Sequence, residues 1–328
     1  MESITKNRQP LSVLRAMVTR AYGAGQVDDG DGWVEELGHG WFNVAYVIRL
    51  RDGRRVVLKI APSPEVEVMT YERDMMRTEV HALALVAGQT TVPVPAVHHY
   101  DPSRELCNAE YFFMDHIDAE NLGIIGEQLS TEANDAYTEA LGAANRELNQ
   151  VKGDHFGSLL GGDPGATWRQ VFTGIVEDVL RDGQRRDVDL GWDYDLIRQV
   201  LAERSDCLDE VVEPVFVEWD LWNSNVMVRD GALVSIIDHE RALFGDPLME
   251  AGFVATQLEA FGDPSGFVRG YGRAPSTPAE RERRRLYNLH LLLIMVIETV
   301  YRGHTEPTQY DWSRARLGEL MASFDSRR

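Results

Sequence analysis

Hydrophobic and polar residues alternate over much of the first third of the chain, as is typical of β-strands. The run "NVAYVIRL" alternates apolar and polar side chains, and a strand with one buried face has this period of two. Asp52 and Gly53 separate it from a second run, "RRVVLKIAP", and an Asp-Gly pair in that position is a strong hairpin signal. Further extended segments are expected at "TTVPVPAVHHYD" and "AEYFFMDHI". The pattern predicts a small antiparallel sheet.

One helix is expected between these strands, over "YERDMMRTEVHALALVAG". Met75, Met76, Val80 and Leu83 recur at roughly helical spacing, and Gly88 is expected to lie just past the helix end.

Beyond about residue 120 the spacing of apolar residues becomes helical, with long amphipathic stretches at 129–150, 165–183, 193–211 and 278–302. Only two short apolar runs, around Asp220 and Asp238, interrupt this pattern. The longest apolar run, at 289–301, is too short for a membrane span and contains Glu298, so it predicts a buried helix. We therefore expect an α+β fold with a β-rich lobe at residues 1–116 and a mostly helical lobe at 117–328.

The net charge of −20 changes this picture little, but it argues against nucleic acid as a partner. Residues 1–116 carry 12 basic and 16 acidic side chains, and residues 117–328 carry 21 and 37. The second part therefore holds most of the acidity, which favours, more weakly, a cationic substrate. The one basic cluster, "RERRR" at 281–285, is expected to be a solvated helix face.

Cysteine content and the N-terminus indicate a cytoplasmic protein. Cys107 and Cys207 are the only two cysteines, and the first residues lack the apolar core of a signal peptide. The acidic surface is compatible with a monomer or an oligomer.

Polar side chains inside the two short apolar runs are candidates for chemistry. Asp220 and Asn225 lie five positions apart in "EWDLWNSN", and Asp238 closes the next run. A buried polar group without a partner costs about 1–3 kcal/mol. These residues therefore either form Asx-type turns or hold a ligand.

Four features then follow one another along the chain. A glycine-bearing turn, "LGHGWFN", lies between two strands, Lys59 lies in the next strand, and Glu79 lies on the helix. The set of Asp220, Asn225 and Asp238 comes last. Each feature alone has a structural explanation, as a hairpin turn, a strand-edge lysine, a solvated carboxylate or a turn former, but their order is informative.

This order resembles the protein-kinase-like fold and, more closely, the aminoglycoside phosphotransferase family of small-molecule kinases. "VEWDLWNSNVMV" is similar to the family's His-Gly-Asp-x4-Asn catalytic loop, and "SIIDHERALFGDP" is similar to its metal-binding segment with Gly-Asp-Pro. The resemblance covers about residues 33–255. It implies a two-lobed fold and transfer of the γ-phosphate of ATP, or of GTP, to a hydroxyl group of a small molecule.

The resemblance also implies roles for individual residues. Asp220 would orient or accept the proton of the acceptor hydroxyl, and Asn225 and Asp238 would bind Mg²⁺ through hard oxygen atoms. Glu240, two residues further on, is a candidate for a direct contact with metal or acceptor. The residues implied in nucleotide binding are Gly38, Gly40 and Asn43 of the turn, Lys59 with its partner Glu79, and Asp115 and Ile117 of the hinge.

The chain departs from the family motif at two positions, because Glu218 and Trp219 stand where the family has His and Gly. Glu218 would add negative charge beside Asp220 and Asp238, and like charges raise the pKa of a carboxyl group. The alternative function is therefore a nucleotide-binding pseudokinase without turnover. A protein kinase is a third reading, but little sequence after Asp238 is left for a peptide-docking segment.

The acceptor is expected to be an amine-bearing antibiotic or metabolite, because the second part of the chain is so acidic. Trp168, Trp219 and Trp222 are candidates for aromatic walls around a cation.

Overall fold

The computed structural model describes residues 3–28, 30–38 and 40–325, and the chain divides into two compact units. The first unit comprises Met1–Val68, Pro95–Asp118 and Tyr301–His304. The second comprises Met69–Val94, Ala119–Val300 and Thr305–Arg328. Each unit has its own sheet structure and is described separately below.

A five-stranded antiparallel sheet forms the first unit, with strand order β1-β2-β3-β5-β4. Its strands are β1 (Val34–Glu36), β2 (Val44–Arg49), β3 (Arg55–Ile60), β4 (Val97–Asp101) and β5 (Tyr111–Asp115). The expected hairpin joins β2 to β3, with Gly53 at a φ of +89° in its turn, a conformation that suits glycine. The predicted small antiparallel sheet is therefore confirmed.

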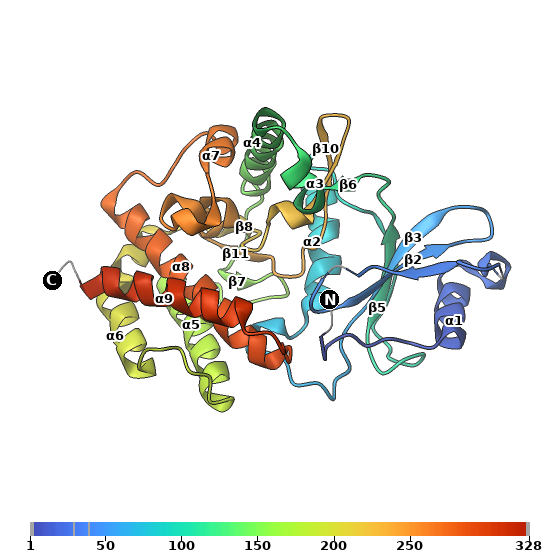
Figure 1. The fold of residues 1–328 in the computed structure, drawn as a ribbon, viewed down its shortest axis with the longest axis horizontal. Helices are drawn as coiled ribbons and strands as arrows, with labels where there is room; N and C mark the ends of the chain where they lie inside the picture. The colour runs from blue at the N-terminus through green and yellow to red at the C-terminus, as the bar shows by residue number, and fades with distance from the viewer. Residues whose placement is uncertain (1–2, 29, 39, 326–328) are drawn as a thin grey trace. The chain divides into compact units, whose positions relative to one another are not determined.

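A helix that the sequence analysis did not anticipate covers this sheet. Helix α1 (Leu11–Tyr22) precedes the strands and is followed by a 3₁₀ turn, η1 (Ala24–Gln26). Leu14, Met17 and Val18 of α1 are buried in one hydrophobic core with strand residues such as Ile48 and Leu58. Figure 1 shows α1 beside β2 and β3.

Helices make up most of the second unit, as predicted. Its α-helices are α2 (Met75–Gln89), α3 (Leu122–Ile125), α4 (Thr131–Leu148), α5 (Trp168–Arg185), α6 (Tyr194–Arg204), α7 (Ser265–Tyr271), α8 (Pro278–Tyr301) and α9 (Thr308–Asp325). Its 3₁₀ helices are η2 (Thr70–Glu72), η3 (Gly126–Gln128), η4 (Ser205–Glu210), η5 (Asn223–Asn225), η6 (Pro247–Met249), η7 (Ala251–Thr256) and η8 (Glu259–Phe261).

Two small antiparallel sheets lie among these helices. One has the order β10-β9-β6 and the other β7-β11-β8. Their strands are β6 (Glu120–Asn121), β7 (Gly157–Ser158), β8 (Val215–Val217), β9 (Val226–Arg229), β10 (Ala232–Ile236) and β11 (Leu243–Gly245). The chain passes from β8 to β9 through the residues around Asp220, and from β10 to β11 through those around Asp238. The two polar segments of the sequence are thus the links between these two sheets.

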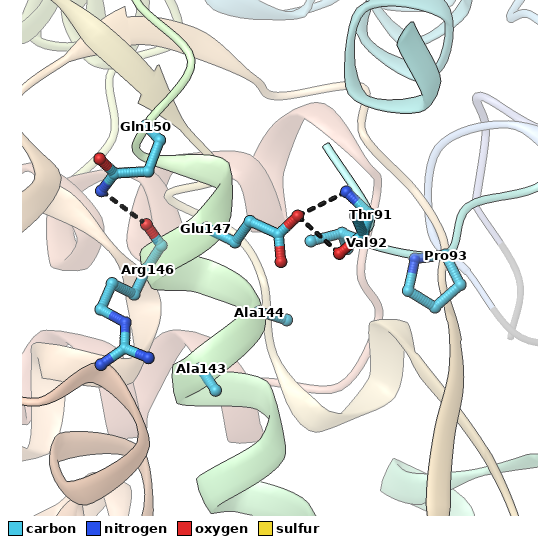
Figure 2. Close-up of a pocket in the computed structure, with 8 residues that line it drawn as sticks. All are labelled: Thr91, Val92, Pro93, Ala143, Ala144, Arg146, Glu147 and Gln150. Carbon is cyan, nitrogen blue, oxygen red and sulfur yellow. Dashed lines mark hydrogen bonds between the residues drawn. The ribbon is translucent and has the colours of Figure 1, made fainter. Parts of the chain in front are cut away.

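Helix α2 packs with the second unit, although the predicted boundary at residues 116 and 117 assigned it to the first lobe. Both flanks of α2 are fixed to the second unit: Thr70 Oγ1 donates to Asp182 of α5 at 2.7 Å, and Thr91 Oγ1 donates to Glu147 of α4 at 2.8 Å (Figure 2). The helix also continues through Gly88 to Gln89, so the expected end at Gly88 was wrong.

The predicted buried helix at 289–301 is the second half of α8, where Leu289, Leu292 and Val296 are inaccessible to solvent. Within the described ranges, none of the helices combines the length and apolar character that a bilayer crossing requires.

The expectation of a solvated basic face at 281–285 was wrong for three of its four arginines, since Arg281 alone among them is exposed. Arg283, Arg284 and Arg285 are at most 6% exposed, because the second unit supplies partners for their charges. Arg283 Nε donates to Asp246 at 2.8 Å, and Tyr287 donates to the same carboxylate oxygen at 2.6 Å. The Asp246 of "GDP" is therefore a buried anchor for α8.

Candidate active site

The segment between β8 and β9 folds into a tight loop that presents Asp220. The three residues of β8 are fully buried, and the chain then turns as Leu221 N donates to the carbonyl of Glu218 at 2.8 Å. The side-chain amide of Asn225 donates to the backbone carbonyl of Asp220 at 3.0 Å. The five-residue spacing thus brings Asn225 back against Asp220.

The carboxylate of Asp220 is held at both oxygen atoms yet stays accessible. Trp222 Nε1 donates to Oδ1 at 2.9 Å, and Arg241 Nε lies 3.3 Å from Oδ2, while the Asp220 side chain is 26% exposed. Burial raises the pKa of the Asp220 carboxyl, and the Arg241 guanidinium and the Trp222 indole oppose that rise. A positioned carboxylate of this kind can take a proton from a bound hydroxyl group.

Arg241 is a site residue that the sequence analysis missed. Its side chain is 12% exposed and is also 3.6 Å from Glu298 Oε2, and its guanidinium lies 5.2 Å from the ring centres of both Tyr71 and Trp219. Cation–π contacts and two carboxylates together stabilise a charge that would otherwise be costly to bury. Its position three residues after Asp238 was the available sequence signal.

A neutral histidine lies in the same cluster. The ring of His290 is 5.0 Å from that of Trp219, and burial and the charge of Arg241 lower the pKa of His290 to about 3.

The segment after β10 brings Asp238 to the loop that carries Asp220 and Asn225. Ile237 N donates to the carbonyl of Asn225 at 2.9 Å, and Asp238 has a φ of +69°. This left-handed conformation is uncommon outside glycine, although Asp tolerates it better than most residues. The backbone of this link thus turns sharply at the predicted metal ligand.

Asp238 lies in a cluster of three carboxylates. Oxygen atoms of Glu79, Asp238 and Glu240 all lie within 4.8 Å of one another. Hard carboxylate oxygens at this spacing fit a cation such as Mg²⁺. Asn225 adds a candidate oxygen, because its amide nitrogen is engaged with Asp220. The donor set therefore suits the magnesium ion that the sequence analysis expected.

Glu218, the departure from the family motif, is paired rather than isolated. Its Oε1 accepts a hydrogen bond from His239 Nδ1, and the other ring nitrogen of His239 lies 3.2 Å from the carbonyl of Ile236. Despite burial, the charge of Glu218 raises the pKa of His239. The pair connects the residue two before Asp220 to the residue after Asp238, so it holds the two segments together.

Next to this pair, the buried carboxyl group of Glu250 is contacted by neutral donors. Glu250 Oε1 accepts from Asn149 Nδ2 at 2.8 Å and from the backbone nitrogen of Glu218 at 3.2 Å. Tyr271 in turn donates to Asn149 at 2.7 Å. Burial raises the pKa of Glu250 to about 8.

The remaining predicted site residues lie in the first unit. Lys59 is central in the sheet, opposite Ala45 on β2 and Phe112 on β5, and is 9% exposed. Gly40 has a φ of +98°, which suits glycine, and Asn43 is buried immediately before β2. Gly38 follows β1, and His39 of the same turn lies outside the described residues.

At the hinge, Asp115 ends β5, and its carboxylate accepts from the backbone nitrogen of Ala96 at 3.0 Å. Ile117 is half-buried two residues further on. Because Lys59 and Glu79 belong to different units, their pairing stays a prediction.

Two of the three candidate tryptophan walls belong to the core. Trp168 and Trp219 are 0% and 5% exposed, and the cation beside Trp219 is the chain's own Arg241. Trp222 is half-buried.

A hollow of about 520 Å³ on the surface of α4 is lined by residues such as Thr91, Ala144 and Glu147 (Figure 2). None of the eight residues lining this hollow is one of the predicted site residues.

Comparison with known proteins gives one family match and several similar structures. Residues 33–287 match the phosphotransferase enzyme family. The structure is similar to a thermostable mutant of aminoglycoside phosphotransferase APH(4)-Ia in ternary complex with AMP-PNP and hygromycin B, with a TM-score of 0.66, 20% identity, and 95% of this chain and 98% of that chain covered. No protein of curated function matches the sequence.

Two further solved structures are similar. One is a putative fructosamine-3-kinase from Thermobifida fusca YX-ER1, with a TM-score of 0.65, 23% identity, and 94% of this chain and 99% of that chain covered. The other is the streptomycin–ATP–APH(2")-IIa ternary complex, with a TM-score of 0.65, 13% identity, and 97% and 99% covered.

The antiparallel sheet of the first unit and the helical second unit thus define a kinase-like fold of the aminoglycoside phosphotransferase type. The chain belongs to the phosphotransferase enzyme family, and its class is that of small-molecule phosphotransferases acting on hydroxyl groups.

Proposed function

We propose that this protein transfers the γ-phosphate of ATP to a hydroxyl group of a small molecule, with Asp220 as the catalytic residue. The observation that carries the proposal is the Asp220 carboxylate, which is fixed at both oxygens and still 26% exposed. Phosphoryl transfer requires positioning and charge stabilisation more than covalent chemistry from the protein.

In the proposed reaction, a bond forms between the acceptor oxygen and the γ-phosphorus as the bond from the γ-phosphorus to the bridging β,γ-oxygen breaks. The proton of the acceptor hydroxyl passes to Asp220, and ADP leaves with the electron pair. Asn225 supports this role because it fixes the backbone of Asp220. Glu218 and His239 support it by joining the loop to the segment of Asp238.

We propose Asn225 and Asp238 as the magnesium ligands, with Glu240 as a further carboxylate beside them. The gathering of Glu79, Asp238 and Glu240 within 4.8 Å supports the site. A bound Mg²⁺ would neutralise charge on the nucleotide phosphates.

Nucleotide binding is proposed for residues of the first unit together with Glu79 of the second. Lys59 would contact the phosphates and pair with Glu79, and glycine in the turn permits close approach of backbone N–H groups to phosphate. The hinge would bind the adenine through main-chain groups. The residues proposed here are Gly38, Gly40, Asn43, Lys59, Glu79, Asp115 and Ile117. ATP is preferred over GTP because two of the similar structures hold ATP or AMP-PNP. We also propose a cytoplasmic location.

For the acceptor we propose an antibiotic or metabolite that carries amino groups. The 37 acidic side chains against 21 basic ones in residues 117–328 support an overall positive acceptor. Hygromycin B and streptomycin are the compounds in two of the similar structures.

The test is consumption of Mg-ATP or Mg-GTP by purified protein against aminoglycosides, macrolides, amino sugars, aminoalcohols and plain sugars. We expect an acceptor-dependent signal that Asp220→Asn abolishes. Nucleotide binding without turnover for any acceptor, unchanged in Asp220→Asn, would instead support the pseudokinase alternative.

A further inference from the structure

Three partly exposed aromatic side chains form a continuous series that begins at Asp220. The rings of Trp222 and Phe261 are stacked, with centres 5.7 Å apart and planes 20° apart. Phe261 meets Trp312 edge to face at 5.2 Å. They come from the catalytic loop, from η8 and from α9, three segments far apart in the sequence. We call Trp222, Phe261 and Trp312 the aromatic ledge.

The ledge differs from the other aromatic clusters of the second unit in its exposure. Trp312 is 37% exposed, and Trp222 and Phe261 are half-buried, whereas Trp168, Phe172 and Tyr287 form a cluster that is at most 2% exposed. Contiguous exposed apolar surface is unfavourable in water and marks a binding site more often than a single exposed residue does. The partial exposure of three adjoining rings therefore makes the aromatic ledge a candidate binding surface.

The inner end of the ledge is fixed to the catalytic carboxylate. Trp222 Nε1 donates to Asp220 Oδ1 at 2.9 Å, so the indole ring lies directly beside the group that would take the proton. An acceptor whose hydroxyl reaches Asp220 must therefore lie against, or next to, this ring.

We propose that the aromatic ledge binds the acceptor and that the acceptor offers it an uncharged, flat ring face beside the reacting hydroxyl. The C–H face of a pyranose and the face of an aryl ring share this chemistry. This inference rests on the proposed function, since it defines the acceptor of that same site.

The charges around the ledge favour a neutral face over an ammonium group. At the inner end, the Arg241 guanidinium pairs with Asp220 and already contacts the rings of Tyr71 and Trp219. At the outer end, the Arg316 guanidinium lies 5.9 Å from the centre of Trp312. Two guanidinium groups thus lie at the ends of the ledge, Arg241 beside Asp220 and Arg316 beside Trp312, where each would repel a ligand cation.

One face of Trp222 is covered by Phe261, and a second flat group packs well on stacked aromatic surfaces. Any amino groups of the acceptor would then point away from the reacting hydroxyl, toward other acidic surface of the second unit. The local geometry therefore narrows the acceptor class that the net charge alone suggested.

The ledge is tested by the KM of the acceptor in the variants Phe261→Ala and Trp312→Ala. We expect each to raise the KM for a ring acceptor about tenfold, the loss of roughly one aromatic contact, with the equilibrium affinity for AMP-PNP unchanged. Trp192→Ala is the matched control. Trp192 is a half-buried tryptophan outside the ledge, and it lies beside Gly318 of α9, the helix that also carries Trp312. The control should leave this KM unchanged.

The probes are methyl glucoside, 4-hydroxybenzyl alcohol and choline, so that a pyranose, an aryl ring and an acyclic cation are compared. Unchanged KM values in both ledge variants, or choline as the best acceptor, would overturn the proposal.

Direct binding separates this proposal from the proposed function. Calorimetry with the same three probes, in the presence of AMP-PNP, measures occupancy without turnover. Ring binding that is lost in Trp312→Ala, with no phosphoryl transfer in the wild type, would support the ledge and reject the kinase activity. Phosphoryl transfer to a hydroxyl, with ring binding equally strong in the ledge variants, would support the kinase activity and reject the ledge.

Discussion

Asp220 and Asp246 are both held by an arginine, but their surroundings differ. The side chain of Asp246 is 4% exposed, and its oxygens accept from Arg283, Tyr287 and the backbone nitrogen of Leu248. Asp220 has Arg241 and Trp222 and is 26% exposed. The same pair of residue types therefore anchors a helix in one place and presents the proposed catalytic carboxylate in the other. The difference is that the chain itself fills the space around the Asp246 carboxylate but leaves part of the Asp220 carboxylate open.

The largest effect is expected for Asp220→Asn. An amide cannot take the proton of the acceptor hydroxyl, and a positioned base contributes about 10²–10⁴-fold to a rate. We expect kcat to fall about 10³-fold. The midpoint of urea unfolding should fall less than in Asp246→Asn, because Asp220 is partly exposed and Arg241 keeps Glu298 as a second carboxylate. Steady-state kinetics and denaturation on the same preparation measure both. A large loss of stability with retained turnover would show that the two aspartates had been assigned the wrong way round.

Asp246→Asn should give the opposite result. Removing the charge leaves the buried Arg283 with the exposed Glu210 as its one remaining anionic partner among the described residues. Breaking a buried ion pair costs several kcal/mol, and we expect the free energy of unfolding to fall by about 3 kcal/mol. Urea unfolding measures this. At a temperature where the variant is folded, kcat should stay close to that of the wild type.

Glu250 extends the comparison to a carboxyl group contacted by neutral donors instead of a guanidinium. Its pKa rises to about 8 from an ordinary value of 4.5, so between these values the folded chain keeps a proton that the unfolded chain releases. Stability from this group therefore falls as the pH rises through that window and levels off above about 8.

Between about pH 6 and pH 7.5 the stabilising contribution of Glu250 therefore falls by about 2 kcal/mol. Glu250→Gln removes the titrating group and should flatten the pH dependence of urea unfolding by that amount. An identical pH dependence in wild type and variant would mean that Glu250 is ionised in the folded chain.

The smallest effect concerns Trp222→Phe. Phenylalanine keeps an aromatic ring for the ledge but loses the N–H that holds Asp220 Oδ1. A single hydrogen bond to a charged group is worth about 1.5 kcal/mol or somewhat more, part of which water can replace at a half-exposed site. We expect kcat to fall about fivefold, or about 1 kcal/mol, with the acceptor KM nearly unchanged. A raised KM with unchanged kcat would assign Trp222 to binding alone.

The sequence allowed the fold and the core of the candidate site to be predicted because both depend on local patterns. Alternation in β2 and β3 and the five-residue spacing of Asp220 and Asn225 are set by neighbours in the chain. Periodicity therefore predicted the sheet, and the resemblance of the segment around Asp220 and Asn225 to a family motif predicted the loop.

Contacts between distant segments were not predictable in this way. His239 meets Glu218 from 21 positions away, and Arg283 was read as solvated because its partner Asp246 comes from another element. Helix α1 was overlooked although its buried side chains belong to the core of the sheet. The aromatic ledge joins three segments, and only the tertiary structure brings them together.

The pairing of Glu218 with His239 has a consequence for protein engineering by consensus. Relative to the family motif, an acid replaces the expected imidazole two residues before Asp220, and an imidazole follows Asp238. Histidine at position 218 alone would place two imidazole rings next to each other and remove the carboxylate that stabilises a proton on His239. The two positions form one unit of design, so a change that improves agreement with the family at one of them must be accompanied by a change at the other.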